Sequence, residues 1–243
     1  MGERLASADM LVSPSRFYSR YMEERLELPE GKIEVMPNGI KMDGYQAAAS
    51  TPEYPTIGYL ARMCREKGLE VMVDGFIRLR KQIGREGVKL RIAGAMTAGD
   101  LPLINELKGR IQEEGLEEDV EWLPNLSREE KITFLQSLTL FSVPVTYPEA
   151  FGLYVLEAIA CGVPVVQPDM ASFPEIIQTT GGGVCVEHNN PKEFAEAWDA
   201  LLSDPERLKT MREQGRQNIE THYSAPQMSK HFLKLTKAYH PTD

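Results

Sequence analysis

Short apolar runs rich in β-branched residues alternate along the chain with longer segments in which apolar residues recur every three or four positions. The short runs predict strands over residues 33–36, 56–60, 89–93, 120–123, 138–143, 163–167 and 183–186. The periodic segments predict helices over residues 69–82, 101–114, 128–136, 152–161, 174–178, 191–202, 205–221 and 225–238. Strands that alternate with helices of this length form βαβ units. The pattern therefore predicts a doubly wound α/β fold with a mostly parallel sheet and a helical C-terminal tail.

We expect residues 1–243 to form one such domain, with residues 41–55 as a polar loop rich in Pro, Gly and Ala. In a doubly wound sheet, ligands bind at the carboxyl ends of the strands. Ligand-binding and catalytic residues are therefore expected directly after the predicted strands.

Composition narrows the functional classes. The formal net charge of −9 argues against a general nucleic-acid binder, which would carry a basic face. The three cysteines (Cys64, Cys161 and Cys185) lack metal-ligand spacing and favour reduced thiols in the cytoplasm. No apolar run reaches the roughly 18 residues that a membrane span requires. The predicted location is the cytoplasm, and a peripheral position at the inner membrane face stays open for the full protein.

One carboxylate, Glu157, interrupts an otherwise apolar segment over residues 153–161. A helix that is apolar on all sides is normally buried, and a buried carboxylate needs a partner because its desolvation is costly. One explanation is a salt bridge to a neighbouring Lys or Arg. The other is that Glu157 points out of the strand ends and accepts hydrogen bonds from ligand hydroxyls, since its two oxygens can hold a vicinal diol such as a ribose.

The residues that flank Glu157 favour the ligand explanation. A second carboxylate, Glu149, lies eight positions earlier, and Gly152 allows a close approach of the backbone to a ligand. The unpaired N–H groups at the start of the predicted helix suit a phosphate. These features together suit a molecule with phosphate between two hydroxyl-rich groups, which is a nucleotide sugar.

Two cations follow the strand predicted over residues 56–60. Arg62 and Lys67 lie in the loop before Gly68, and in an acidic protein they are the best local candidates for binding a diphosphate. A charge pair at 4 Å is worth about 4 kcal/mol at an effective dielectric constant near 20, so two cations and helix dipoles can hold a diphosphate without a metal. This interpretation places Glu157 at an open cleft with both cations across from it.

Several motifs resemble the retaining GT-B glycosyltransferases of family 4, in that family's order. Residues 149–157, E-A-F-G-L-Y-V-L-E, resemble its E-x7-E motif, and the following G-V-P-V-V resembles its G-x-P-V-V. Residues 61–68 resemble its G-R-x-x-x-x-K-G, with Ala61 in place of the first Gly. The segments KIEVMPNGI, LRIAG and SFPEII resemble further family segments, so the likeness covers nearly the whole chain.

The resemblance implies a role for each matched position. Arg62 and Lys67 are expected to bind the donor diphosphate, and Glu149 to lie near the transferred sugar. Glu157 is expected to hold the ribose. The backbone N–H groups of Phe151, Gly152 and Leu153 are expected to contact sugar or phosphate, and the base to lie near Leu126. The resemblance implies no metal and no cofactor, with a UDP-, GDP- or ADP-sugar as the substrate.

Departures from the family fall on the donor-sugar side. Thr146-Tyr147-Pro148 and Gln167-Pro168-Asp169 replace the usual residues there. The resemblance also covers only the C-terminal, donor-binding domain of a GT-B enzyme. The N-terminal GT-B domain is expected to be absent from this chain. The chain would then bind donor weakly and transfer little, because only one of the two domains that align the substrates would be present.

Two other functions stay open from the sequence. One is a module that binds a nucleotide or a sugar nucleotide without transfer. The other is a related sugar-nucleotide epimerase or phosphorylase. Glu149 together with Arg62 and Lys67 favours the transferase, because a binder of base and phosphate needs no carboxylate at the transferred sugar.

Overall fold

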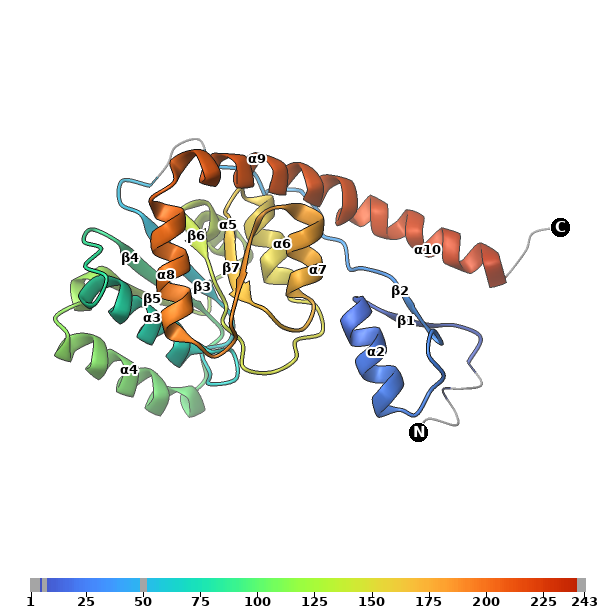
Figure 1. The fold of residues 1–243 in the computed structure, drawn as a ribbon, viewed down its shortest axis with the longest axis horizontal. Coiled ribbons are helices and arrows are strands. Elements are labelled where there is room, and N and C mark those ends of the chain that lie inside the picture. Colours follow the sequence, from blue (N-terminus) through green and yellow to red (C-terminus); the bar gives the residue numbers. More distant parts are fainter. Residues whose placement is uncertain (1–4, 6–7, 49–51, 240–243) are drawn as a thin grey trace.

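A parallel six-stranded sheet forms the centre of the molecule, as a computed structural model of residue 5, residues 8–48 and residues 52–239 shows (Figure 1). The strand order is β5-β4-β3-β6-β7-β8. Its strands are β3 (Thr56–Leu60), β4 (Lys89–Gly94), β5 (Val120–Pro124), β6 (Leu140–Phe141), β7 (Val165–Pro168) and β8 (Gly183–Val186). The prediction of a doubly wound, mostly parallel α/β fold is confirmed.

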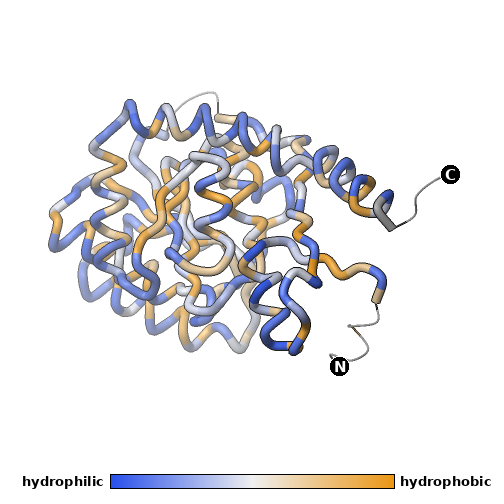
Figure 2. Tube along the Cα trace, turned by 45° about the vertical axis from the view of Figure 1, so that its right-hand side comes forward, coloured by the Kyte–Doolittle hydropathy of each residue, from blue (hydrophilic) through white to orange (hydrophobic). Residues whose placement is uncertain are grey.

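Helices cover both faces of this sheet. They are α3 (Leu69–Lys81), α4 (Leu101–Glu113), α5 (Arg128–Gln136), α6 (Leu153–Ala160), α7 (Phe173–Thr180), α8 (Pro191–Leu202) and α9 (Pro205–His222). Helix α3 packs against α4 and α8, whereas α6 and α7 pack against α9. Because both faces are covered, all five positions of β3 are buried, as expected for a central parallel strand. Figure 2 shows hydrophobic positions along the inner strands and an alternation of hydrophobic and hydrophilic positions along the outer helices.

The chain reverses direction across the sheet at β3. Strands β4 and β5 extend to one side of β3, and the chain then returns to place β6 on the other side. Residue Gly58 of β3 therefore pairs with Arg91 of β4 and with Phe141 of β6. The loops that follow β3 and β6 both lie at this switch point, where open α/β sheets bind their ligands.

The N-terminal residues form a separate unit. Strands β1 (Leu11–Ser13) and β2 (Ile33–Val35) pair in parallel, with α2 (Arg16–Arg25) between them. The strand predicted over residues 33–36 is therefore present but lies outside the main sheet. Helix α2 was not predicted, because its buried positions are the polar Ser19 and Glu23. Ser19 Oγ donates to the Ile33 carbonyl at 2.7 Å, and Glu23 accepts from the Ile33 N–H at 2.8 Å.

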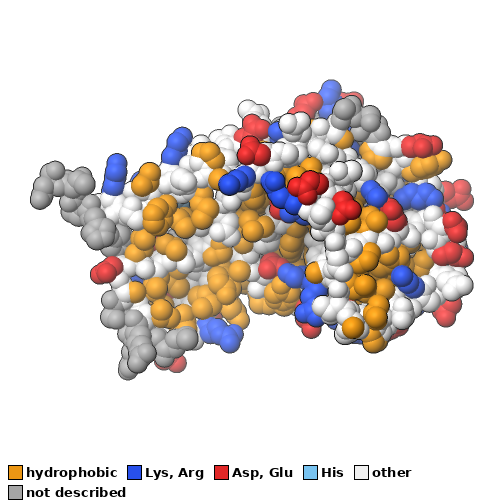
Figure 3. Space-filling model, turned by 180° about the vertical axis from the view of Figure 1, so that it is seen from behind, with side chains coloured by type: hydrophobic (Ala, Val, Ile, Leu, Met, Phe, Trp, Pro, Cys, Tyr) orange, Lys and Arg blue, Asp and Glu red, His pale blue; other side chains and the backbone are white. Residues whose placement is uncertain are grey.

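The last helix, α10 (Ala225–Tyr239), extends from α9 toward this N-terminal unit (Figure 1). Seen from behind, hydrophobic side chains gather over that end of the molecule (Figure 3). Val12, Phe232 and Leu233 are among the exposed apolar residues, with Leu233 57% exposed. In the part of the chain that the structure describes, no helix is long and apolar enough to cross a membrane.

Candidate active site

Residues 61–68 after β3 and residues 142–152 after β6 meet at the switch point of the sheet. These two loops are joined directly, because the Thr146 N–H donates to the Glu66 carbonyl at 3.0 Å. Gly68 has a left-handed φ of +72°, and a Cβ there would collide with the carbonyl of Pro144. A glycine is therefore required at position 68 for the two loops to meet this closely.

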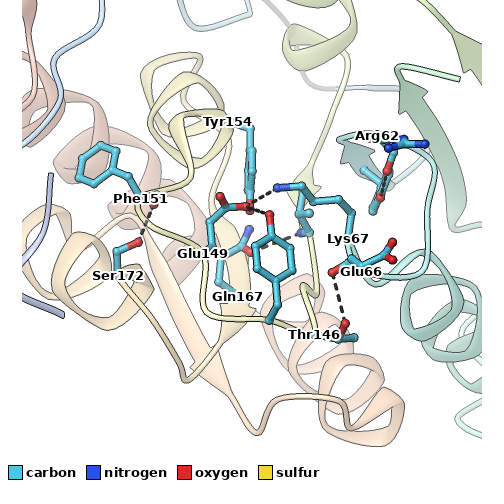
Figure 4. A network of polar contacts seen from close by, with 12 residues as sticks. Arg62, Glu66, Lys67, Thr146, Glu149, Phe151, Tyr154, Gln167 and Ser172 are labelled. Carbon is cyan, nitrogen blue, oxygen red and sulfur yellow. Dashed lines mark hydrogen bonds and ion pairs between the residues drawn. The ribbon is translucent and has the colours of Figure 1, made fainter. Parts of the chain in front are cut away.

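Lys67 and Glu149 form an ion pair that connects these two loops (Figure 4). Their side chains are 20% and 16% exposed, so the pair is partly shielded from water. The Lys67 ammonium also lies 5.0 Å from the ring centre of Tyr147 and 5.6 Å from that of Tyr154. Burial is the largest single influence and disfavours the charge on Lys67, but the hydrogen bonds and charges of Glu149 and Tyr147 together outweigh it, and the pKa of Lys67 is raised above its ordinary value.

Hydrogen-bond donors among the described residues reach one oxygen of Glu149. Oε2 accepts from Lys67, from the Tyr147 hydroxyl at 3.0 Å and from the Tyr154 hydroxyl at 3.2 Å. No described residue donates to Oε1. The protein therefore fixes the orientation of the carboxylate through one oxygen and leaves the other as an acceptor for a ligand.

Arg62 lies apart from this cluster, and its side chain is 57% exposed. It pairs with Asp100 at 3.1 Å, and Asp100 also accepts from the Thr97 N–H at 2.9 Å and the Thr97 hydroxyl at 2.7 Å. The Asp100 carboxylate faces Thr97 and Arg62 and makes no hydrogen bond to the start of the helix that follows. Both expected phosphate-binding cations thus have an acidic partner in this structure.

Glu157 is paired with a protein cation, and its contact with a ribose stays a prediction. Its Oε1 accepts from Lys131 at 2.6 Å and from the Tyr45 hydroxyl at 2.7 Å. Lys131 lies 5.7 Å from the ring centre of Tyr45. The salt bridge, the simpler of the two explanations, is therefore present. No described residue donates to Oε2 of this 16% exposed side chain, so one oxygen rather than two is free to meet a ligand hydroxyl.

The N-terminus of α6 has the features expected for anion binding. Gly152 adopts a left-handed φ of +85° directly before the helix. No described residue accepts from the backbone N–H of Leu153 or Tyr154, and Leu153 is 45% exposed. Phe151 has a buried side chain, and its carbonyl accepts from Ser172 Oγ at 2.6 Å, which fixes the turn. Free N–H groups at the positive end of a helix favour a bound phosphate.

Leu126 lies farther away, in the loop after β5. The preceding residue, Asn125, has a φ of +58°, and its side chain accepts from the Met96 N–H at 2.9 Å. Leu126 is half-buried against the core. Its contact with a nucleotide base stays a prediction.

One departure from the family pattern places a polar group in the interior. Gln167 on β7 is fully buried, near Glu149 in the network of Figure 4. Its Oε1 accepts from the Val143 N–H at 3.4 Å, and its Nε2 has no partner among the described residues. An unpaired buried amide is costly, so Gln167 is a feature of this chain that packing alone does not explain.

Sequence reasoning missed the residues that orient the two carboxylates. Lys131 and Tyr45 are 26 and 112 positions from Glu157, and no local pattern connects them. In the sequence, Tyr147 is only a departure from the family pattern and Tyr154 is an unspecified position between Glu149 and Glu157. Neither position indicated a hydrogen-bond donor to Glu149. Among the described residues, no group of three or more His, Cys, Asp or Glu side chains lies close enough together to hold a metal ion.

Several known proteins have sequences similar to that of this chain. A D-inositol 3-phosphate glycosyltransferase from Nocardia farcinica is 27% identical over 222 residues, which cover 87% of this chain and 49% of that protein. An exopolysaccharide phosphotransferase from Streptomyces coelicolor is 29% identical over 96% of this chain and 24% of its own length. The chain spans about half the length of the glycosyltransferase relatives or less.

Two solved structures share the fold. Sucrose-phosphate synthase from Thermosynechococcus elongatus superposes with a TM-score of 0.85 at 22% identity, over 100% of this chain and 61% of that one. HepE from Anabaena, in complex with UDP and glucose, superposes with a TM-score of 0.84 at 17% identity, over 95% and 64%. Residues 46–218 match the family described as Glycosyl transferases group 1. Since this match covers more than half of the sequence, the chain belongs to the group 1 glycosyltransferases.

Proposed function

We propose that this chain is the donor-binding half of a retaining, family 4 glycosyltransferase that moves a hexosyl group from a nucleoside diphosphate sugar to an acceptor. The observation that carries the proposal is the Lys67–Glu149 pair at the switch point of the sheet. It supports the proposal because a cation that can bind a diphosphate lies beside a carboxylate with one oxygen that no described residue uses.

The donor diphosphate meets three sources of positive potential. Lys67 turns from Glu149 toward the phosphates, Arg62 moves from Asp100, and the free N–H groups of Leu153 and Tyr154 complete the cradle. As the bond between the sugar and the diphosphate breaks, these groups stabilise the negative charge on the departing nucleoside diphosphate. Oε1 of Glu149 then accepts from a hydroxyl of the transferred sugar.

The nucleoside end occupies the neighbouring part of the crevice. Oε2 of Glu157 accepts from one ribose hydroxyl, and the base packs near Leu126. UDP is the first nucleotide to test, because HepE, which shares the fold, was solved with UDP and glucose. No metal is required, so a chelator is expected to leave nucleotide binding unchanged.

The acceptor side of a GT-B cleft needs a second Rossmann-like domain. We propose that such a domain completes the site and that residues 1–243 alone transfer little, because proximity of two substrates supplies much of the rate. The expected location is the cytoplasm, including the inner face of the membrane for the full protein.

Calorimetric titration with UDP, GDP and ADP tests the donor site. At least one nucleotide is expected to bind, and Lys67→Ala to weaken it. Absence of binding by all three at millimolar concentration rejects the proposal. Glu149→Gln separates a transferase from a plain nucleotide-binding module: it is expected to retain UDP binding and to abolish slow hydrolysis of the donor sugar. Measurable hydrolysis by Glu149→Gln equal to that of the unmodified chain would favour the module.

A further inference from the structure

Gln167 places an amide in the interior at a position where this chain departs from the family pattern. It lies on β7, and its side chain is fully buried. Its Oε1 accepts from the Val143 N–H at 3.4 Å, which is long for a hydrogen bond, and its Nε2 has no partner among the described residues. An acceptor alone would be enough to hold the Val143 N–H, so this contact does not account for the amide donor.

A carboxylate oxygen that lacks a donor belongs to the same network. Figure 4 shows the Gln167 amide beside the carboxylate of Glu149. The described donors to Glu149 are Lys67 and the hydroxyls of Tyr147 and Tyr154, and all three reach Oε2. A buried donor without an acceptor and a carboxylate oxygen without a described donor therefore lie close together.

The ion pair with Lys67 decides how the Glu149 carboxylate is held in this structure. When a diphosphate takes Lys67, as the proposed function requires, Glu149 keeps two neutral phenol donors and loses its cation. The Glu149 side chain is only 16% exposed, and a largely buried carboxylate without its partner is costly. A further donor to Glu149 would lower this cost and so favour the diphosphate-bound state.

We propose that Gln167 is a positioning residue for Glu149, whose Nε2 donates to Oε1 of Glu149 when Lys67 turns to the diphosphate. The inference rests on the proposed donor site and deepens it. A carboxylate oxygen has two lone pairs, so Oε1 can accept from Gln167 and from a hydroxyl of the transferred sugar together. Gln167 thus orients the carboxylate for the sugar and touches no ligand itself.

A double-mutant cycle on UDP affinity, measured by calorimetric titration, tests this role. Gln167→Met removes the amide at similar volume and should weaken UDP binding about tenfold, as expected for the loss of a hydrogen bond to a charged group. In the Glu149→Gln background the same substitution should change UDP affinity little, because the negative charge that Gln167 stabilises is gone.

A merely structural role of Gln167 predicts a different result. If the side chain only supports the Val143 N–H, Gln167→Met should weaken UDP binding equally with and without the Glu149→Gln substitution. Equal losses in the two backgrounds overturn the proposal, as does unchanged UDP affinity in Gln167→Met. Gln167→Ala also removes the amide and should give the same cycle, so the test does not depend on how methionine fits. Urea unfolding checks that each variant is folded.

Thr180 provides a matched control, because it is also fully buried and polar but has its hydrogen bonds satisfied. Its hydroxyl donates to the Ile176 carbonyl at 2.8 Å and accepts from the Gly182 N–H at 3.2 Å. Thr180→Val should therefore lower stability and leave UDP affinity unchanged.

The two proposals fail in distinguishable ways. Absence of UDP binding by the unmodified chain rejects the donor site and the role of Gln167 together. UDP binding that Lys67→Ala weakens and Gln167→Met does not weaken rejects only the role of Gln167.

Discussion

The two glutamates of the E-x7-E motif are held by similar sets of residues. Glu149 has Lys67 and two tyrosines, and Glu157 has Lys131 and one tyrosine. In each set the lysine also lies over a tyrosine ring. Each carboxylate receives all its described hydrogen bonds on one oxygen, so the other oxygen stays open to a ligand.

The two clusters differ in what they connect. The Lys67–Glu149 cluster joins the loops after β3 and β6 across the switch point of the sheet. The Lys131–Glu157 cluster joins α5, α6 and the linker residue Tyr45, whose side chain is buried. An ion pair between two loops at the ligand-binding edge of a sheet can exchange its partner for a ligand. An ion pair that connects two helices and a linker is expected to support the fold. We therefore propose that similar chemistry serves ligand exchange in the first cluster and stability in the second.

The substitution with the largest expected effect tests whether the Lys67–Glu149 pair exchanges its partner for a ligand. Lys67→Ala should weaken UDP binding by about 2–5 kcal/mol, because a partly desolvated cation is lost from the diphosphate site. Calorimetric titration measures the change. Lys209→Ala, at an exposed position of α9, is the control and should bind UDP normally. Unchanged affinity in Lys67→Ala would show that the Lys67–Glu149 pair is structural, like its counterpart.

The stability side is tested by Lys131→Met, which leaves Glu157 with a single protein donor. We expect a loss of about 1–3 kcal/mol in the free energy of unfolding, because a largely buried carboxylate loses its cation. Lys67→Met should cost less, since Glu149 keeps two phenol donors. Urea unfolding of both variants measures the difference. A greater loss in Lys67→Met would mean that the Lys67–Glu149 pair, and not the Lys131–Glu157 pair, stabilises the fold. The double variant Lys131→Met/Glu157→Gln should recover part of the unfolding free energy that Lys131→Met loses.

Alkaline pH should weaken both clusters. Desolvation disfavours the charged lysines, yet their hydrogen bonds to Glu149 and Glu157 leave the pKa values of Lys67 and Lys131 raised. Burial raises the pKa of Tyr45 as well. A raised pKa favours the protonated form in the folded state, so this stability is fully present below the ordinary values near 10 and is lost as pH rises through the folded values.

Urea unfolding at several pH values from about 9 to 11 measures this loss. The variant Lys131→Met/Glu157→Gln should lose less stability over the same range than the unmodified chain does. Identical pH profiles for the two proteins would mean that the Lys131–Glu157 cluster contributes nothing to the alkaline transition.

Arg62→Gln should have the smallest effect on UDP binding, well below that of Lys67→Ala, because the Arg62 side chain is 57% exposed and well screened by solvent. Calorimetric titration under the conditions used for Lys67→Ala allows a direct comparison. A loss as large as that of Lys67→Ala would mean that Arg62 leaves Asp100 and becomes buried against the diphosphate.

Most of the sheet could be predicted from the sequence, because its strands are continuous apolar runs and each is followed by its own helix. The run from Thr56 to Leu60 is buried at every position, so burial and local pattern agree. The prediction failed for α2, whose buried residues Ser19 and Glu23 are polar and are satisfied by the backbone of β2. Polar contacts between distant segments leave no hydrophobic periodicity to detect.

The candidate site divides in the same way. The sequence by itself determined which side chains stand after β3 and β6, and thus that Lys67 and Glu149 reach the switch point, because parallel strand ends share one edge of a sheet. Only the tertiary structure decided which donors each carboxylate has. The partners of Glu157 come from a helix 26 positions away and a linker 112 positions away. Hydrogen bonds and ion pairs depend on distance in space, which the packing of helices and loops sets and which no local pattern encodes.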